Sequence, residues 1–190
     1  RMGRIAGIAI LLMSMLPASV QASTKSTYHA KTVSENGKFV ASQLPYLPEF
    51  TITKFGDESL KNPQDIVSDT KNQLLYIADT DNKRIVVSDY EGNLVRIIGD
   101  GILKAPQGLC LGLESNSLYV ADQAAEKVFQ FNTDGELISE YSKPVEPLFG
   151  KNSKYQPVKV AVDIAENVYV ISSGNTNGII QLSNDGYFLG

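Results

Sequence analysis

The chain has 190 residues, of which 43% are hydrophobic and 20% are charged, so it can bury a core of its own. Its formal net charge is −4 and its pI is near 5.0, without the excess of Lys and Arg that nucleic-acid-binding proteins carry. Composition therefore predicts one globular domain, with or without appendages, and excludes nucleic acid as an expected partner.

The first 22 residues differ in composition from the rest of the chain. Arg1 and Arg4 precede an apolar run over residues 5–16, and small residues follow Pro17 up to Ala22. This order is typical of a secretory signal peptide, and the run is short for a membrane span of about 20 residues or for a buried helix. We therefore predict a signal peptide at residues 1–22, an extended segment at residues 23–50, and a secreted protein or one at the extracytoplasmic cell surface.

Residues 51–190 contain a repeat with a period of about 43 residues. Each copy has four short runs rich in Val, Ile, Tyr and Phe, which favour strands, with an Asp-Gly or Glu-Gly hairpin signal before the fourth run. Four antiparallel strands in such a repeat have the size of a β-propeller blade, so we predict an all-β fold. The aligned positions are Pro63, Asp69, Tyr76, Asp79, Gly92 and Gly99, then Pro106, Gly112, Tyr119, Asp122, Gly135 and Ser142, with a third copy from Pro157.

The stretches "NPQDIVSD", "LYIADTDNKRIVV" and "EGNLVRIIG" resemble NHL repeats. The resemblance implies a propeller, commonly of six blades, so about three blades are expected here, with repeats at about 57–99, 100–142 and 151–190. It also implies a fragment of a longer exported protein, and the alternative is a half ring that pairs with itself. "FTITKFG" at residues 50–56 resembles an orphan outermost strand, which in a closed ring completes the last blade.

Residues 26–62 are similar to the opening of a group of exported bacterial propeller proteins. Some members of that group continue into a membrane region and are associated with sugar-uptake systems. This second likeness implies membrane anchoring by a region absent from this chain and association with such a system.

Cys110 is the single cysteine, so the chain cannot form an internal disulfide. We interpret it as a buried core residue rather than a nucleophile, because the only histidine, His29, lies before the repeats. Zinc chemistry with several histidine ligands is excluded for the same reason. A calcium site is left open, because oxygen ligands are plentiful in the sequence. However, the sequence has no calcium-binding loop motif, and "DTDN" at residues 79–82 is a weak match to one, so we expect no cofactor.

The carboxylates Asp79 and Asp122 are candidates for a catalytic pair. They occupy the same place in successive repeats, so we interpret them as turn residues that accept backbone N–H bonds, and Asp69 and Asp163 likewise. Repeated tyrosines on the second strand are expected to pack between blades. These are Tyr76, Tyr119 and Tyr169.

Ligand or partner contact is expected where the first strand of each blade lines the channel, just after the repeated proline. The candidates are Asp65, Gln107 and Lys159, and Arg84 is added as a loop contact whose alternative role is packing against a neighbouring blade. We predict a non-catalytic propeller that binds a protein, peptide or glycan through its loop face. The alternative is a calcium-dependent hydrolase or lyase with its site at the channel mouth.

Overall fold

The structure is a computed structural model that describes residues 31–41, 50–113, 115–146, 149–150, 152–175 and 178–190. The predicted signal peptide lies outside these residues. The chain divides into two compact units, Arg1–Thr51 and Ile52–Gly190. In the first unit, β1 (Lys31–Val33) pairs antiparallel with β2 (Phe39–Ala41), and the hairpin leaves Phe39 exposed.

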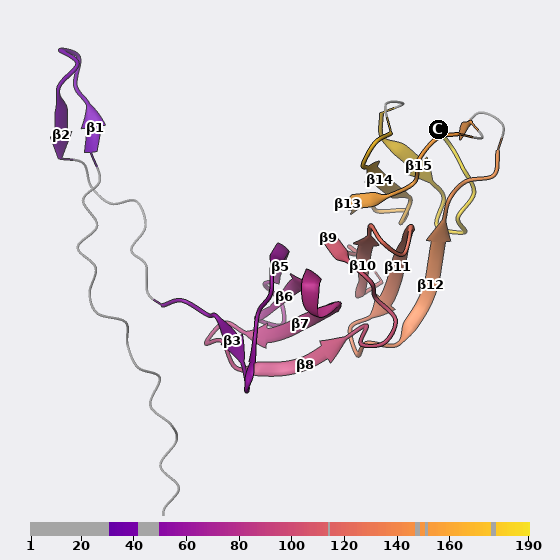
Figure 1. The fold of residues 1–190 in the computed structure, drawn as a ribbon, viewed down its shortest axis with the longest axis horizontal. Coiled ribbons are helices and arrows are strands. Elements are labelled where there is room, and N and C mark those ends of the chain that lie inside the picture. The colour runs from indigo at the N-terminus through magenta and orange to yellow at the C-terminus, as the bar shows by residue number, and fades with distance from the viewer. Residues whose placement is uncertain (1–30, 42–49, 114, 147–148, 151, 176–177) are drawn as a thin grey trace, which may run out of the picture. The chain divides into compact units, whose positions relative to one another are not determined.

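The second unit is built from antiparallel sheets whose strands follow one another in chain order (Figure 1). The first sheet contains β5 (Pro63–Asp69), β6 (Leu74–Asp79), β7 (Arg84–Asp89) and β8 (Leu94–Ile98). The second contains β9 (Pro106–Leu111), β10 (Ser117–Asp122), β11 (Lys127–Asn132) and β12 (Leu137–Ser142). The third contains β13 (Pro157–Val162), β14 (Val168–Ser172) and β15 (Ile180–Leu182).

The all-β prediction of about three four-stranded blades is confirmed. In the third sheet the fourth run pairs with β15, because Gln181 donates to the Gly190 carbonyl over 2.7 Å and Leu189 donates to the Gln181 carbonyl over 2.8 Å. The hairpin signals are correct as well, since Gly92, Gly135 and Gly186 have φ of 86°, 97° and 83°, where a side chain would be strained. A short 3₁₀ turn, Thr80–Asn82, lies between β6 and β7.

The blades stack through their faces, with the first strand of each on the inner edge (Figure 1). In each blade alternate residues face opposite neighbours, so Tyr76 and Ala78 pack with the second blade, while Tyr119 and Ala121 pack with the third. Each fully buried aliphatic side chain in these seams contributes about 1.5–3 kcal/mol. The far face of the third blade leaves Ile171 50% exposed at the position where the other blades bury alanine.

The predicted orphan strand forms a small hairpin, in which β3 (Lys54–Phe55) pairs with β4 (Glu58–Ser59). Phe55 packs on Ile77 and Val86, on the face of the first blade that is turned away from the second. Ile98 and Tyr141, one and two repeats later, are buried in the seams that their blades form with the next blade. Phe55 therefore packs as an outer-strand residue does, and its part in completing a last blade stays a prediction.

Candidate functional site

The repeated aspartate at the end of the second strand ties that strand to the loop before the first strand. Asp122 accepts the backbone N–H groups of Lys104 over 2.7 Å and Ala105 over 2.9 Å. Asp79 accepts the N–H of Lys61 over 2.7 Å. In the third blade, Ser172 takes the role by accepting the N–H of Gln156 over 2.7 Å. These bonds agree with the interpretation of the two aspartates as structural residues.

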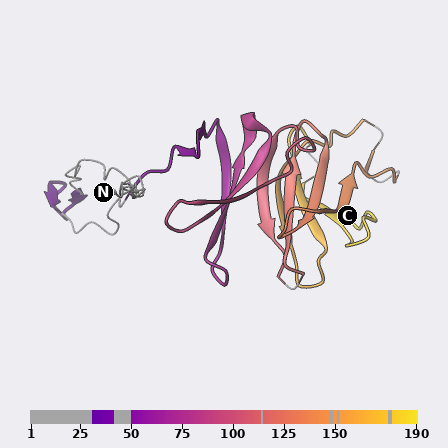
Figure 2. The same ribbon diagram turned by 90° about the horizontal axis from the view of Figure 1, so that it is seen from below.

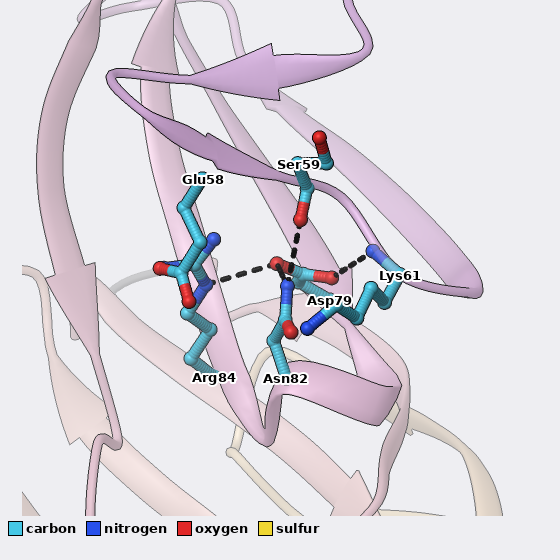
Figure 3. Close-up of polar contacts among 6 residues, drawn as sticks. All are labelled: Glu58, Ser59, Lys61, Asp79, Asn82 and Arg84. Carbon is cyan, nitrogen blue, oxygen red and sulfur yellow. Dashed lines mark hydrogen bonds and ion pairs between the residues drawn. The ribbon is translucent and has the colours of Figure 1, made fainter.

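Asp79 differs from Asp122 because it also binds two side chains of its own blade (Figure 3). Its Oδ2 accepts hydrogen bonds from Asn82 Nδ2 over 2.8 Å and Arg84 Nε over 2.9 Å. Asn82 donates to the Ser59 carbonyl over 2.9 Å, and Arg84 Nη1 donates to the Glu58 carboxylate. The cluster therefore fastens the β3–β4 hairpin to the first blade.

Burial makes this cluster a strong constraint. The Asp79 side chain is fully buried and that of Arg84 is 10% exposed, whereas that of Glu58 is 57% exposed. Arg84 Nη2 is buried without a hydrogen-bond partner among the described residues. Arg84, predicted as a partner contact, is thus held by intramolecular ion pairs. Glu58 could not be predicted as a member of this cluster, because its partner Arg84 lies 26 positions away in the sequence.

The first-strand candidates Asp65 and Lys159 meet at the inner edge. Asp65 Oδ2 accepts hydrogen bonds from the Leu109 backbone over 3.0 Å and from Lys159 Nζ over 2.8 Å. One carboxylate therefore contacts the first strands of three blades. The side chains of Asp65 and Lys159 are 22% and 51% exposed, so the pair is fixed in place and accessible to solvent.

Gln107 is not part of this pair and donates instead to Gln123 Oε1. The residue of β9 that matches Asp65 and Lys159 is Gly108, because all three pair with the penultimate residue of the second strand. A Cβ on Gly108 would lie 2.6 Å from the Val158 carbonyl oxygen. The missing side chain lets the second and third blades approach closely. The sequence signal that could have predicted this close approach is a glycine at the repeat position where the other two blades have Asp65 and Lys159.

Cys110 lies on the same strand and packs against the core between the second and third blades. It is partly buried, and burial raises the pKa of its thiol. Its Sγ contacts the Leu111 carbonyl at 3.5 Å. Cys110 is therefore a mostly protonated thiol at neutral pH.

The repeated tyrosines pack between blades where a further blade follows. Tyr76 and Tyr119 are fully buried, and Tyr119 donates to Glu166 Oε2 of the third blade over 2.8 Å. Burial and this hydrogen bond raise the pKa of Tyr119, so it stays a donor. Tyr169 is half-buried and donates to Asp163 over 3.1 Å. Glu166 went unnoticed in the sequence because its partner belongs to another repeat.

The Tyr76 hydroxyl is buried and has no partner among the described residues. The repeat places Asn116 of the second blade, with φ of 49°, where Glu166 of the third has φ of 60°. Asn116 is shorter by one methylene, so it does not supply the acceptor that Glu166 gives Tyr119.

We expect Asn116→Glu to supply that acceptor and to raise the free energy of unfolding by about 1 kcal/mol, measured by urea denaturation. Tyr76→Phe is the control, because it removes a hydroxyl that is unpaired in the wild type. It should be nearly neutral there and should cancel the gain in the Asn116→Glu background. A large loss from Tyr76→Phe in the wild type would contradict this assignment.

Two further findings concern metals and membranes. Over the described part of the chain, no group of three or more His, Cys, Asp or Glu side chains is placed to hold a metal ion. His29 lies outside that part. Within the same residues, no helix has the length and apolar character needed to span a membrane.

Comparison with known proteins gives one family and several solved structures. Residues 60–87 match the NHL repeat family. No curated protein matches the chain. Among solved structures, a chain of the nidogen/laminin complex is 22% identical, with a TM-score of 0.57 over 69% of this chain and 47% of its own length.

Two bacterial enzymes have a similar fold. Hydrazine synthase of Kuenenia stuttgartiensis is 15% identical, with a TM-score of 0.56 over 72% of this chain and 36% of its own. A catalytically inactive virginiamycin B lyase of Staphylococcus aureus is 17% identical, with a TM-score of 0.53 over 83% of this chain and 46% of its own. The chain thus spans less than half the length of these structures. At such identities the likeness shows the fold alone.

Proposed function

Because the chain is an NHL-repeat β-propeller chain, we propose that it is a non-catalytic binding protein that holds a protein or peptide partner outside the cytoplasm. The repeated polar residues support this proposal, since they hold blades and loops together. The signal peptide that the sequence predicts at residues 1–22 supports the extracytoplasmic location. Anchoring to a membrane by a further region and association with a sugar-uptake system belong to the same proposal.

The Asp65–Lys159 pair is the observation that carries the proposal. It places one carboxylate and one ammonium at the inner edge, held by strands of the first and third blades. Only one of the three N–H groups of Lys159 is used by Asp65, and half of the side chain faces solvent. A partner can therefore bind Lys159 through a carbonyl or carboxylate without displacing Asp65. The nidogen/laminin neighbour is a propeller chain in a protein complex, which supports a protein partner.

The test compares proteins of the extracytoplasmic fraction of the source cells that bind the immobilised chain. Lys159→Met removes the ammonium and keeps the aliphatic stem, and Lys104→Met, on an exposed loop residue, is the matched control. We expect the wild type and the Lys104→Met control to retain the same partner protein in similar amounts. The Lys159→Met variant should retain at least about tenfold less of it. Equal retention by all three would contradict the proposal.

A second measurement separates binding from the enzymatic alternative. The melting temperature and any hydrolase or lyase activity are recorded with calcium and with a chelator. A binding scaffold without a metal site should give the same melting temperature in both conditions. Activity that depends on calcium, together with a higher melting temperature in its presence, would replace the proposal with a calcium-dependent enzyme.

A further inference from the structure

In a sheet of antiparallel strands that follow one another in chain order, the turn from the first to the second strand and the turn from the third to the fourth strand belong to the same end of the blade, which we call the turn end. Figure 2 views the stacked blades from below. Four apolar or aromatic residues are exposed there, although turns usually carry small and polar residues. Leu113 is 67% exposed, Ile164 71%, Tyr187 69% and Tyr90 38%. The described residues of the six turns are 69–73, 89–93, 112–113, 115–116, 132–136, 163–167 and 183–187.

Leu113 and Ile164 occupy the same place in the turns of neighbouring blades, directly after the position of Asp69. The first blade has Thr70 there, so the turn itself does not require an apolar side chain. An apolar side chain that is about two-thirds exposed gains little from the fold. Its burial by a partner would be favourable, which suits this pair to anchor a bound segment.

These two turns are fixed relative to each other by Glu166. Its Oε1 accepts the backbone N–H of Ser115 over 3.1 Å, and its Oε2 accepts the buried Tyr119 hydroxyl. Gly112 leaves the space, because a Cβ there would lie 2.9 Å from Glu166 Oε1. The tips are thus preorganised, and their ordering costs little on binding.

The turn end is strongly acidic. Among the described residues of these turns, Lys71 is the only basic one, and the acidic residues are Asp69, Asp89, Glu91, Asp134, Glu136, Asp163, Glu166 and Asp185. The loops at the opposite end have both signs of charge, with Lys61, Lys83, Lys104 and Lys154 beside Asp81, Asp100, Glu126 and Glu146.

Hydrogen bonds to neutral donors orient several of these carboxylates without cancelling their charge. Asn93 donates to Asp89 through its backbone over 2.7 Å and its side chain over 2.8 Å, and Asn167 does the same for Asp163. The asparagine side-chain bond is the largest cause of the lowered pKa at both carboxyls. In contrast, Asp134 forms an ion pair with Arg96 at 2.9 Å.

The surface therefore combines fixed apolar tips with fixed negative charge.

We propose that the turn end docks a cationic segment of a partner protein that carries apolar side chains. The segment's Lys or Arg residues pair with the turn carboxylates while its apolar residues cover Leu113 and Ile164. Anionic lipid surfaces and nucleic acids are repelled by the same charge. The inference rests on the proposed binding function and names the partner's chemistry and the end that receives it.

The test measures binding of labelled synthetic peptides to the full chain by fluorescence anisotropy. The probe alternates lysine and leucine, and its two matched peptides replace every lysine by glutamate or every leucine by glycine. We expect the lysine–leucine peptide to bind at least about tenfold more tightly than either matched peptide, with an affinity that falls as salt is raised. Equal binding of the three peptides would overturn the proposal.

Variants locate the site. Leu113→Thr with Ile164→Thr should weaken the probe about tenfold, while Ile102→Thr, at an exposed residue of the opposite end, should leave it unchanged. Glu91→Gln with Asp185→Asn should weaken it and flatten the salt dependence, with Asp100→Asn as control. Unchanged melting temperatures show that the variants fold. Probe binding that all variants leave intact overturns the proposal, as does binding to anionic vesicles in place of the peptide.

The natural partner separates the two proposals. If the natural partner is lost with Lys159→Met but is still retained by the Leu113→Thr, Ile164→Thr variant, the proposed docking surface is overturned. The proposed binding function is then still supported. Retention that is lost in the double variant supports the docking surface. A chain that retains no partner at all contradicts the binding function itself.

Discussion

Asp79→Ala is expected to lower the free energy of unfolding by about 3–5 kcal/mol. The substitution removes the fully buried carboxylate that accepts hydrogen bonds from Arg84, Asn82 and the Lys61 backbone. Arg84 would keep its buried guanidinium with Glu58 as its remaining ion-pair partner, and a buried charge without compensation is costly. Urea denaturation followed by circular dichroism measures the loss.

Glu58→Gln is the matched control for this prediction. It alters the other carboxylate on Arg84, but the Glu58 side chain is 57% exposed, so we expect a change of at most about 1 kcal/mol. A cost of Asp79→Ala no larger than that of Glu58→Gln would show that the solvated carboxylate alone satisfies Arg84. The buried Asp79–Arg84 pair would then have little weight in the fold.

Gly108→Ala is the second large effect, and we expect it to cost about 1–3 kcal/mol. The added Cβ would lie 2.6 Å from the Val158 oxygen and 2.8 Å from Lys159 Cα, and both are backbone atoms that cannot rotate away. Relief requires β9 and β13 to separate, which also stretches the contact between Asp65 and Lys159. The same denaturation experiment gives the magnitude.

Gly190→Ala serves as the control, because a Cβ at that glycine meets nothing within 4 Å. It should leave the free energy of unfolding unchanged. Lys159→Met separates the two parts of the Gly108 effect, since it removes the ion pair without adding volume and should cost at most about 1 kcal/mol. If Gly108→Ala proved no more costly than Lys159→Met, the seam would be looser than the structure indicates.

The local features of the fold could be predicted from the sequence. The repeat period set the four strands of each blade, and Gly92, Gly135 and Gly186 marked the hairpins. Both depend on residues that are close along the chain, where strand propensity and φ decide the outcome. Tyr76 and Tyr119 were also interpreted correctly as packing between blades, because one large side chain recurs at one strand position.

Contacts between repeats could not be predicted in the same way. The sequence placed Asp65 and Lys159 separately on first strands, but their ion pair depends on how the blades stack and on the space that Gly108 leaves. Glu166 and Glu58 carried no local signal, since their partners lie in a neighbouring repeat or before the first one. The position of a residue along its strand determines which face of the sheet its side chain is on. The stacking of the blades determines which residues of the neighbouring blade it contacts there.

The reach of Asp65 has a consequence for how the array unfolds. In repeat proteins whose units contact only their neighbours, stability is approximately a sum of unit and interface terms, so loss of a terminal unit removes contacts of the adjacent unit alone. Here one carboxylate of the first blade bonds to the second blade and also to Lys159 of the third. Separating the third blade therefore disturbs the first, so the three blades share a cooperative element that nearest-neighbour stacking lacks.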